Sequence, residues 1–284
     1  MKVSLLDYAF AHSPSGSVSP GDYNWPCKHI QWERKDRIGD TIVITDGAIE
    51  DNLSELDNFN YHYKIGWLIE PRISFPDRYE LLSREDVYNK FNMIMTYEKS
   101  MLSYSDKFVY YPYGGCWIDE KDRKLHNKTK DISIISSFKR DLPGHRLRHE
   151  VINAFHIFID GIYGNGYRPV EHKITALKDY RYSIVIENNK TEDYFSEKLI
   201  DCFATGTIPI YYGAPGIGNY FNINGFYTFD NLEDLHKILT QCSEDDYNNK
   251  LDIIRENLDI SKNYTHAEDW IYNEIFKKYG ICNL

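Results

Sequence analysis

The sequence predicts an α/β protein built from two parallel sheets with crossover helices. Short apolar runs alternate with amphipathic stretches along most of its 284 residues, which is typical of βαβ units. The alternation starts a second time after the polar segment 119–130. Hydrophobic residues make up 42% and charged residues 27%, an ordinary globular composition that excludes wholesale disorder. The economical arrangement is two Rossmann-like domains facing a central cleft.

The first half contains five apolar runs that we expect to be strands: Val3–Leu6, Thr41–Thr45, Lys64–Ile69, Met93–Thr96 and Phe108–Tyr111. The Ser-, Pro- and Gly-rich segment His12–Pro26 is expected to be a long loop near the carboxyl end of the first strand, where α/β folds place ligands. Asp119–Lys130 has almost no apolar residue and is the best linker candidate. We therefore predict one Rossmann-like domain at 1–128 and a second at 129–284. This division leaves open whether the last helix packs back on the first domain.

The second half repeats the alternation. We expect strands over Ile132–Ile135, Ile157–Ile162, Tyr182–Ile186 and Thr207–Tyr212, helices over about Arg146–His156 and Glu192–Thr205, and a helix-rich stretch over Leu232–Tyr279. Thr191, Glu192 and Asp193 supply a start signal for the second of these helices. Gly206 supplies its end.

Charge and cysteine content narrow the class of protein. The formal net charge is −10, which repels a phosphate backbone and disfavours nucleic-acid binding. The five cysteines are widely spaced and form no Cys-x-x-Cys pair, which argues against a disulfide framework or structural zinc and fits a reducing compartment. No apolar run approaches the roughly 20 residues that span a bilayer, and the first ten residues read as a strand rather than a signal peptide. We therefore expect a cytoplasmic protein with no transmembrane segment.

The most informative stretch is Tyr182–Gly213. Its predicted helix has an apolar face that would pack on the sheet, formed by Phe195, Leu199, Cys202 and Phe203. A different face carries Tyr194, Glu197, Lys198 and Asp201. A nucleotide-sugar could meet there a cation for phosphate, a carboxylate for hydroxyl groups and a ring for stacking. A solvated helix face explains the same spacing equally well.

A second cluster precedes this stretch, where a strand runs through a Ser/Lys/Arg/Gly loop, 136–146, into a helix. Basic residues at a helix N-terminus oppose the macrodipole unless an anion is present, so the loop is a candidate diphosphate cradle. A basic solvated loop is the alternative. His145 and His149 have a spacing that could bind zinc, but no third ligand is evident.

Three ordered segments of the second half resemble the donor-binding motif of the α1,3-fucosyltransferase family. They are Ile186-Glu187-Asn188, Tyr194-Phe195-Ser196-Glu197-Lys198-Leu199 and Gly206 to Gly213. The match extends over about thirty residues in the right order, which makes it far more specific than a lone glycine-rich loop. Phe195, Ser196 and Asn189 depart from the family pattern without removing a charge. The resemblance implies a GT-B architecture and inverting transfer of fucose from GDP-fucose without an obligatory metal or cofactor. It also implies that 1–128 is the acceptor-side domain and that 129–284 is the nucleotide-sugar-binding domain.

The resemblance also implies donor-binding residues. Tyr194, Glu197 and Lys198 match the donor-binding Tyr, Glu and Lys of the motif, and Asn188 matches its Asn. In the basic loop, Arg148 is the better match to a phosphate-binding arginine of the family. Arg146 is the alternative, because a Gly-His insert makes the alignment uncertain.

An inverting transfer needs a carboxylate that removes the proton of the acceptor hydroxyl. Glu70 lies at a predicted strand end before a proline, and it resembles the presumed catalytic Glu of the family, which precedes a proline step. An ion pair with Arg72 would explain Glu70 equally well. Three further carboxylates at strand ends stay open as candidates: Glu98, Asp46 and Asp7.

The sequence therefore predicts an inverting glycosyltransferase that moves a sugar from a nucleotide-diphosphate donor, GDP-fucose by default, to an oligosaccharide hydroxyl. It contains no Asp-x-Asp, a pair that holds a metal in other transferases, so we expect Arg and Lys to stabilise the leaving diphosphate. One alternative keeps the fold and site but uses another donor such as UDP-xylose. Another is a non-catalytic carbohydrate- or nucleotide-binding protein on a decayed transferase scaffold.

Overall fold

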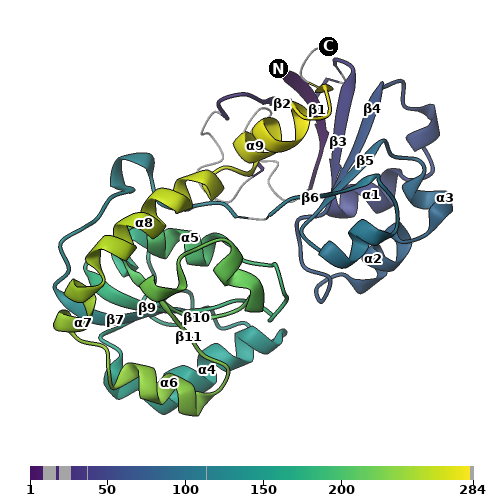
Figure 1. Ribbon diagram of the computed structural model, residues 1–284. Coiled ribbons are helices and arrows are strands. Elements are labelled where there is room, and N and C mark those ends of the chain that lie inside the picture. The colour runs from purple at the N-terminus through teal and green to yellow at the C-terminus, as the bar shows by residue number, and fades with distance from the viewer. Residues whose placement is uncertain (9–16, 19–26, 37, 113, 282–284) are drawn as a thin grey trace. The chain divides into compact units, whose positions relative to one another are not determined.

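The computed structural model describes residues 1–8, 17–18, 27–36, 38–112 and 114–281. Most of the predicted loop His12–Pro26 lies outside the described residues. The chain forms two compact units (Figure 1). Unit 1 comprises Met1–Tyr113 with His266–Leu284, and unit 2 comprises Gly114–Thr265.

Unit 1 contains a parallel sheet in the order β2-β1-β3-β4-β5-β6. Its strands are β1 (Lys2–Leu6), β2 (Gln31–Glu33), β3 (Thr41–Thr45), β4 (Tyr63–Trp67), β5 (Met93–Thr96) and β6 (Phe108–Tyr110). The five predicted strands are confirmed, and β2 was missed because three residues give no readable pattern. The strand predicted over Lys64–Ile69 ends early at Trp67, because the Ile69 N–H donates to the Asp46 carboxylate (3.0 Å).

Helices cover both faces of this sheet (Figure 1). α1 (Asp46–Asn52), α2 (Pro76–Leu82) and α3 (Glu85–Tyr88) share one core with Ile42 and Ile44 of β3 and Ile94 of β5. Trp67 points to the opposite face, where its ring stacks edge-on against Tyr111, which in turn meets Trp270. Trp270 ends α9 (Ala267–Trp270), which continues into a π-helix over Ile271–Phe276.

Unit 2 contains a parallel sheet in the order β11-β10-β9-β7-β8. Its strands are β7 (Lys130–Ile135), β8 (Gly161–Tyr163), β9 (Tyr180–Ile186), β10 (Ile208–Tyr212) and β11 (Tyr227–Thr228). The strand predicted over Ile157–Ile162 is wrong in position, because the Asp160 carboxylate binds the N–H groups of Asp131 and Ile132 and the ladder starts only at Gly161. β7 lies between β8 and β9, so the carboxyl ends of β7 and β9 form the topological switch point where α/β sheets bind ligands.

Five helices complete unit 2: α4 (Pro143–Phe155), α5 (Glu197–Ala204), α6 (Leu232–Leu239), α7 (Glu244–Asn249) and α8 (Leu251–Ser261). α5 and α8 lie on one face of the sheet, and α4 and α6 lie on the other (Figure 1). The predicted helix start at Glu192 is wrong, because α5 begins only after Ser196, whose hydroxyl accepts from the Lys198 N–H. In the described part of the chain, no helix combines the length and the apolar character needed to cross a membrane.

Candidate active site

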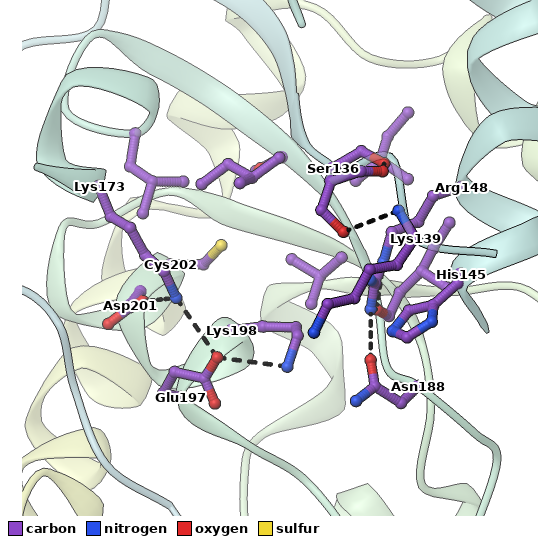
Figure 2. Close-up of a pocket in the computed structure, with 17 residues that line it drawn as sticks. Ser136, Lys139, His145, Arg148, Lys173, Asn188, Glu197, Lys198, Asp201 and Cys202 are labelled. Carbon is purple, nitrogen blue, oxygen red and sulfur yellow. Dashed lines mark hydrogen bonds and ion pairs between the residues drawn. The ribbon is translucent and has the colours of Figure 1, made fainter. Parts of the chain in front are cut away.

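A cavity of about 320 Å³ lies at the switch point of unit 2, within the size range of ligand pockets. Its walls come from β7, β9 and the segments after them, from the first two turns of α4 and α5, and from the 3-10 turn Lys173–Ala176 with Leu177. Figure 2 shows the side chains that line it. Its charged lining residues are four cations and two carboxylates: Lys139, Arg148, Lys173, Lys198, Glu197 and Asp201. The excess of positive charge beside two helix N-termini suits an anionic ligand.

A fully buried carboxylate sets the start of α5. Glu187 follows β9 and accepts from the Ser196 backbone N–H (2.9 Å) and from the Ser196 hydroxyl (2.7 Å). This contact holds Ser196 in an extended conformation, with φ −124° and ψ −176°, which is the geometry of an N-cap. The chain therefore enters the helix at Glu197, five residues later than the sequence signal indicated.

Glu197 and Lys198 occupy the first turn of α5 and line the cavity. The Lys198 ammonium donates to Glu197 Oε1 (3.2 Å) and to the Ser196 hydroxyl (3.0 Å), and it lies 3.6 Å from the Glu187 carboxylate. Burial would raise the pKa of Glu197, but the attraction of Lys198 and Lys173 outweighs it and lowers this pKa to about 2. Glu197 is therefore an ionised hydrogen-bond acceptor at neutral pH.

Lys173 is a cavity residue that sequence reasoning missed. It lies in a 3-10 turn before β9, and its ammonium donates to Asp201 (3.0 Å) and Glu197 (3.4 Å), as Figure 2 shows. Burial would lower the pKa of Lys173, but these two carboxylates raise it. Asp201 also accepts from the Trp117 N–H (2.7 Å). An isolated lysine in a short turn has no periodic pattern, so only its ion-pair partners reveal it.

Arg148 lies on the first half of α4 with its guanidinium at the end of β9. Its Nε donates to the Ile186 carbonyl (3.0 Å) and its Nη2 to the Asn188 side-chain oxygen (3.0 Å). Gly144 makes this approach possible, because a Cβ at that position would lie 1.8 Å from the Glu187 carbonyl oxygen. Burial lowers the pKa of Arg148, yet a guanidinium keeps its charge in proteins.

Two residues matched by the resemblance lie elsewhere. Arg146 is exposed and donates to the carbonyls of Arg140 (3.1 Å) and Asp141 (2.9 Å), away from the cavity. Tyr194 precedes α5, is 4% exposed and does not line the cavity. The predicted face that joined Tyr194 to Glu197 and Lys198 is therefore wrong, because no helix extends through Tyr194. Its role in donor binding stays a prediction.

The two histidines of α4 have different surroundings. His145 lines the cavity, and its Nδ1 accepts from the Leu142 N–H (3.3 Å). His149 uses both ring nitrogens, with Tyr167 Oη at 2.7 Å and the Lys139 carbonyl at 3.1 Å. Across the described residues, no group of three or more His, Cys, Asp and Glu side chains could hold a metal ion.

Glu70 lies in unit 1, three residues after the end of β4 at Trp67. Its backbone N–H donates to the Asp46 carboxylate (3.3 Å), and its carbonyl accepts from the Tyr79 hydroxyl (2.6 Å). Arg72 pairs with Glu98 (2.8 Å). The other open candidate, Asp7, pairs with Arg34 (2.8 Å). Asp46 also has a basic partner, since Arg78 lies 3.3 Å from its carboxylate.

Comparison with known proteins places this site in a family. The family model described as glycosyltransferase family 10 (fucosyltransferase), C-terminal, matches residues 125–283. The Helicobacter pylori α-(1,3)-fucosyltransferase FucT is 34% identical over 76 residues, which are 25% of this chain and 16% of that protein. A Bos taurus 4-galactosyl-N-acetylglucosaminide 3-α-L-fucosyltransferase 9 is 24% identical over 174 residues, 59% of this chain and 46% of that protein. The matches thus span less than half of these relatives.

Solved structures confirm the fold class. An α1,3-fucosyltransferase structure aligns with a TM-score of 0.54 at 16% identity, covering 90% of this chain and 81% of that one. An α1,3-fucosyltransferase with GDP-fucose aligns with a TM-score of 0.52 at 14% identity, covering 93% and 90%. With its two parallel α/β sheets, the chain has the GT-B fold of glycosyltransferases. Since the family model matches more than half of its residues, the chain belongs to glycosyltransferase family 10, the fucosyltransferases.

Proposed function

We propose that this protein transfers L-fucose from GDP-fucose to a hydroxyl group of an oligosaccharide, with inversion at the sugar carbon and without a metal ion. The observation that carries the proposal is the cavity of unit 2, in which Arg148 and Lys198 lie beside the ionised Glu197. This cavity falls within the segment matched by the family model. Related solved structures contain GDP and GDP-fucose.

Arg148 and Lys198 hold the diphosphate in this proposal. As the bond between the sugar carbon and the phosphate oxygen breaks, negative charge grows on the leaving GDP. Fixed cations stabilise that charge without reorganisation, which is the role a metal ion has in other transferases. The Arg148 guanidinium is fixed by the Ile186 carbonyl and Asn188, so it is oriented before the donor binds.

Glu197 and Asn188 bind hydroxyl groups of the donor. Glu197 is an acceptor because Lys198 and Lys173 keep it ionised. Asn188 accepts from Arg148 through its oxygen, so its amide nitrogen is the atom that donates to the ligand. Tyr194 stays in the proposal only through its match to the family motif.

Glu70 is the catalytic base in this proposal. Its carboxylate removes the proton of the acceptor hydroxyl while the oxygen attacks the sugar carbon opposite the departing GDP, so that the configuration inverts. Relatives named as fucosyltransferases of 4-galactosyl- and 3-galactosyl-N-acetylglucosaminides support a proposed acceptor class. We therefore propose galactosyl-N-acetylglucosamine disaccharides as first acceptors.

Calorimetry with GDP, UDP, GDP-fucose and UDP-xylose, each with and without EDTA, tests the donor. We expect a preference for GDP and GDP-fucose that chelation leaves unchanged. Arg148→Ala should weaken GDP binding at least tenfold, because it removes a charged phosphate contact of about 1.5–3 kcal/mol. Arg146→Ala on the same helix is the matched control. Tight UDP binding would indicate a UDP-sugar donor in place of GDP-fucose. Equal effects of the two arginine variants would refute the assignment of Arg148 to the diphosphate.

Transfer assays with both galactosyl-N-acetylglucosamine isomers test the chemistry. Glu70→Gln should lower kcat by about 10²–10⁴-fold, the usual contribution of a general base. It should leave GDP affinity unchanged. Donor binding without any turnover in the unmodified protein would favour the non-catalytic scaffold.

A further inference from the structure

The main chain around Glu70 is bound by side chains from two helices. The Asp46 carboxylate, at the first residue of α1, accepts from the N–H groups of Ile69 (3.0 Å) and Glu70 (3.3 Å). The Tyr79 hydroxyl, on α2, donates to the Glu70 carbonyl (2.6 Å). The peptide groups on both sides of Glu70 are therefore fixed by side chains and not by the sheet.

The turn after Glu70 is tied to the same group of side chains. The Tyr97 hydroxyl accepts from the Arg72 N–H (3.1 Å) and lies 3.2 Å from the Tyr79 hydroxyl. Tyr79 and Tyr97 are fully buried. Buried hydroxyl groups that bond backbone atoms are costly to misplace, so the main chain at Glu70, after the end of β4, has one defined direction.

Asp46 adopts an unusual backbone conformation to reach this position. Its φ is 38°, and its residue exposure is only 8%. Left-handed backbone is strained for residues with a side chain, although Asp and Asn tolerate it better than most. Strain of this kind persists where the surroundings fix it, and it gathers at functional sites.

Asp46 interacts electrostatically with groups from three elements: Arg78 and Tyr79 of α2, Glu70 after β4, and Tyr111 after β6. Glu50 of α1 forms an ion pair with Arg78. Burial raises the pKa of Asp46 to about 7; the Ile69 N–H and Arg78 oppose this rise, and Glu70 adds to it. The two carboxylates therefore influence each other near neutral pH.

We propose that Asp46 and Tyr79 are positioning residues for the transfer reaction, which hold the Glu70 main chain so that its carboxylate keeps one orientation toward the acceptor hydroxyl. The inference rests on the proposed function, in which Glu70 is the base. General-base catalysis depends on hydrogen-bond distance to the proton it removes, and small displacements of a positioned group cost large factors in rate. Asp46 and Tyr79 thus act through Glu70 and not on the substrate.

The test compares Asp46→Asn and Tyr79→Phe with two controls in the same unit, Asp51→Asn on the exposed side of α1 and Tyr88→Phe on α3. Asn keeps the size and the tolerance for positive φ of Asp, but an NH2 group replaces one carboxylate oxygen. Asp46→Asn therefore removes the charge and one of the two oxygens that accept from the Ile69 and Glu70 N–H groups. We expect kcat for fucose transfer from GDP-fucose to galactosyl-N-acetylglucosamine to fall about tenfold or more in both positioning variants. The KM for GDP-fucose should stay unchanged, because the donor cavity lies in unit 2. The controls should match the unmodified protein.

The pH dependence and amide exchange separate positioning from general damage. The pH dependence of kcat should have an apparent pKa near 7 that shifts in Asp46→Asn and does not shift in Asp51→Asn. Hydrogen exchange of the Ile69 and Glu70 amides should be faster only in Asp46→Asn. The inference would be overturned if amide exchange is unchanged in Asp46→Asn. It would also be overturned if Glu70→Gln is inactive while both positioning variants keep the kcat and the pH profile of the unmodified protein. If the unmodified protein transfers no fucose, or Glu70→Gln keeps full activity, the proposed function fails. Amide exchange alone then decides whether Asp46 holds the segment.

Discussion

Glu187 and Ser196 are joined by two hydrogen bonds, from the Ser196 N–H to Oε1 (2.9 Å) and from the Ser196 hydroxyl to Oε2 (2.7 Å). The carboxylate lies at the end of β9 and the serine caps α5. This pair therefore fixes the helix start beside the strand end. It places Glu197 and Lys198 in the turn that faces the cavity.

Glu187→Gln should destabilise the protein and weaken donor binding together. Glutamine has one acceptor oxygen, so one of the two Ser196 donors loses its buried partner, which costs about 1–3 kcal/mol. The loss of charge 3.6 Å from Lys198 also frees that ammonium to move. Denaturant unfolding and GDP titration measure both effects. Glu192→Gln, an exposed change nearby, should alter neither, and a Glu187→Gln protein with unmodified stability would show that the pair is not required.

Lys173→Met should leave Asp201 and Glu197 as two close carboxylates without their shared cation. Breaking a buried ion pair costs about 3–5 kcal/mol. We expect about 2 kcal/mol here, because the lysine side chain is 24% exposed and solvent screens the pair. GDP affinity should also fall, since the cavity loses one positive charge. The double variant Lys173→Met/Asp201→Asn should recover part of the stability in urea unfolding; a double variant no more stable than the single one would contradict the ion-pair explanation.

Lys128 should make the free energy of unfolding depend on pH between about 7 and 10.5. Its ammonium is buried and donates to the Thr205 carbonyl (2.9 Å) and the Thr207 hydroxyl (2.8 Å). Burial lowers its pKa from 10.5 to about 7. Between these values the unfolded chain binds more protons than the folded one, so this group makes stability rise as pH increases from 7 toward 10.5.

Unfolding free energies at pH 7, 8 and 9 check this dependence on Lys128. The difference between the unmodified protein and Lys128→Met should grow with pH in favour of the unmodified protein. Lys124→Met, an exposed change in the same segment, should keep a constant difference. Parallel curves for Lys128→Met and the unmodified protein would refute the prediction.

Gly144→Ala should disrupt the approach of α4 to β9. The new methyl group would lie 1.8 Å from the Glu187 carbonyl oxygen, so α4 must shift and carry Arg148 with it. Overpacking of this kind costs about 1–3 kcal/mol, and GDP affinity should fall because Arg148 leaves its place. Thermal unfolding and calorimetry measure these two losses. Glu150→Ala, exposed on the same helix, is the control, and unchanged GDP affinity in Gly144→Ala would separate Arg148 from donor binding.

The sequence alone predicted most of the sheet strands, because buried parallel strands are apolar runs bounded by polar segments. Runs such as Thr41–Thr45 and Met93–Thr96 agree with the structure residue for residue. β2 and β11 were missed, since strands of three and two residues have too few side chains to form a pattern. The resemblance to the donor-binding motif also singled out Asn188, Glu197 and Lys198, which follow the end of one predicted strand, and all three line the cavity.

Tertiary structure alone decided the remaining features of the site. Arg146 and Arg148 are two residues apart, so a helix of 3.6 residues per turn directs them to nearly opposite sides, and the packing of α4 on β9 turns Arg148 inward. Lys173 joins the cavity through ion pairs with residues 24 and 28 positions away, a distance that no local pattern records. The true start of α5 depends on Glu187, nine positions before Ser196. Local sequence thus determined which segments become strands and helices, whereas side-chain direction and long-range charge pairing arose only when the folded chain brought these groups together.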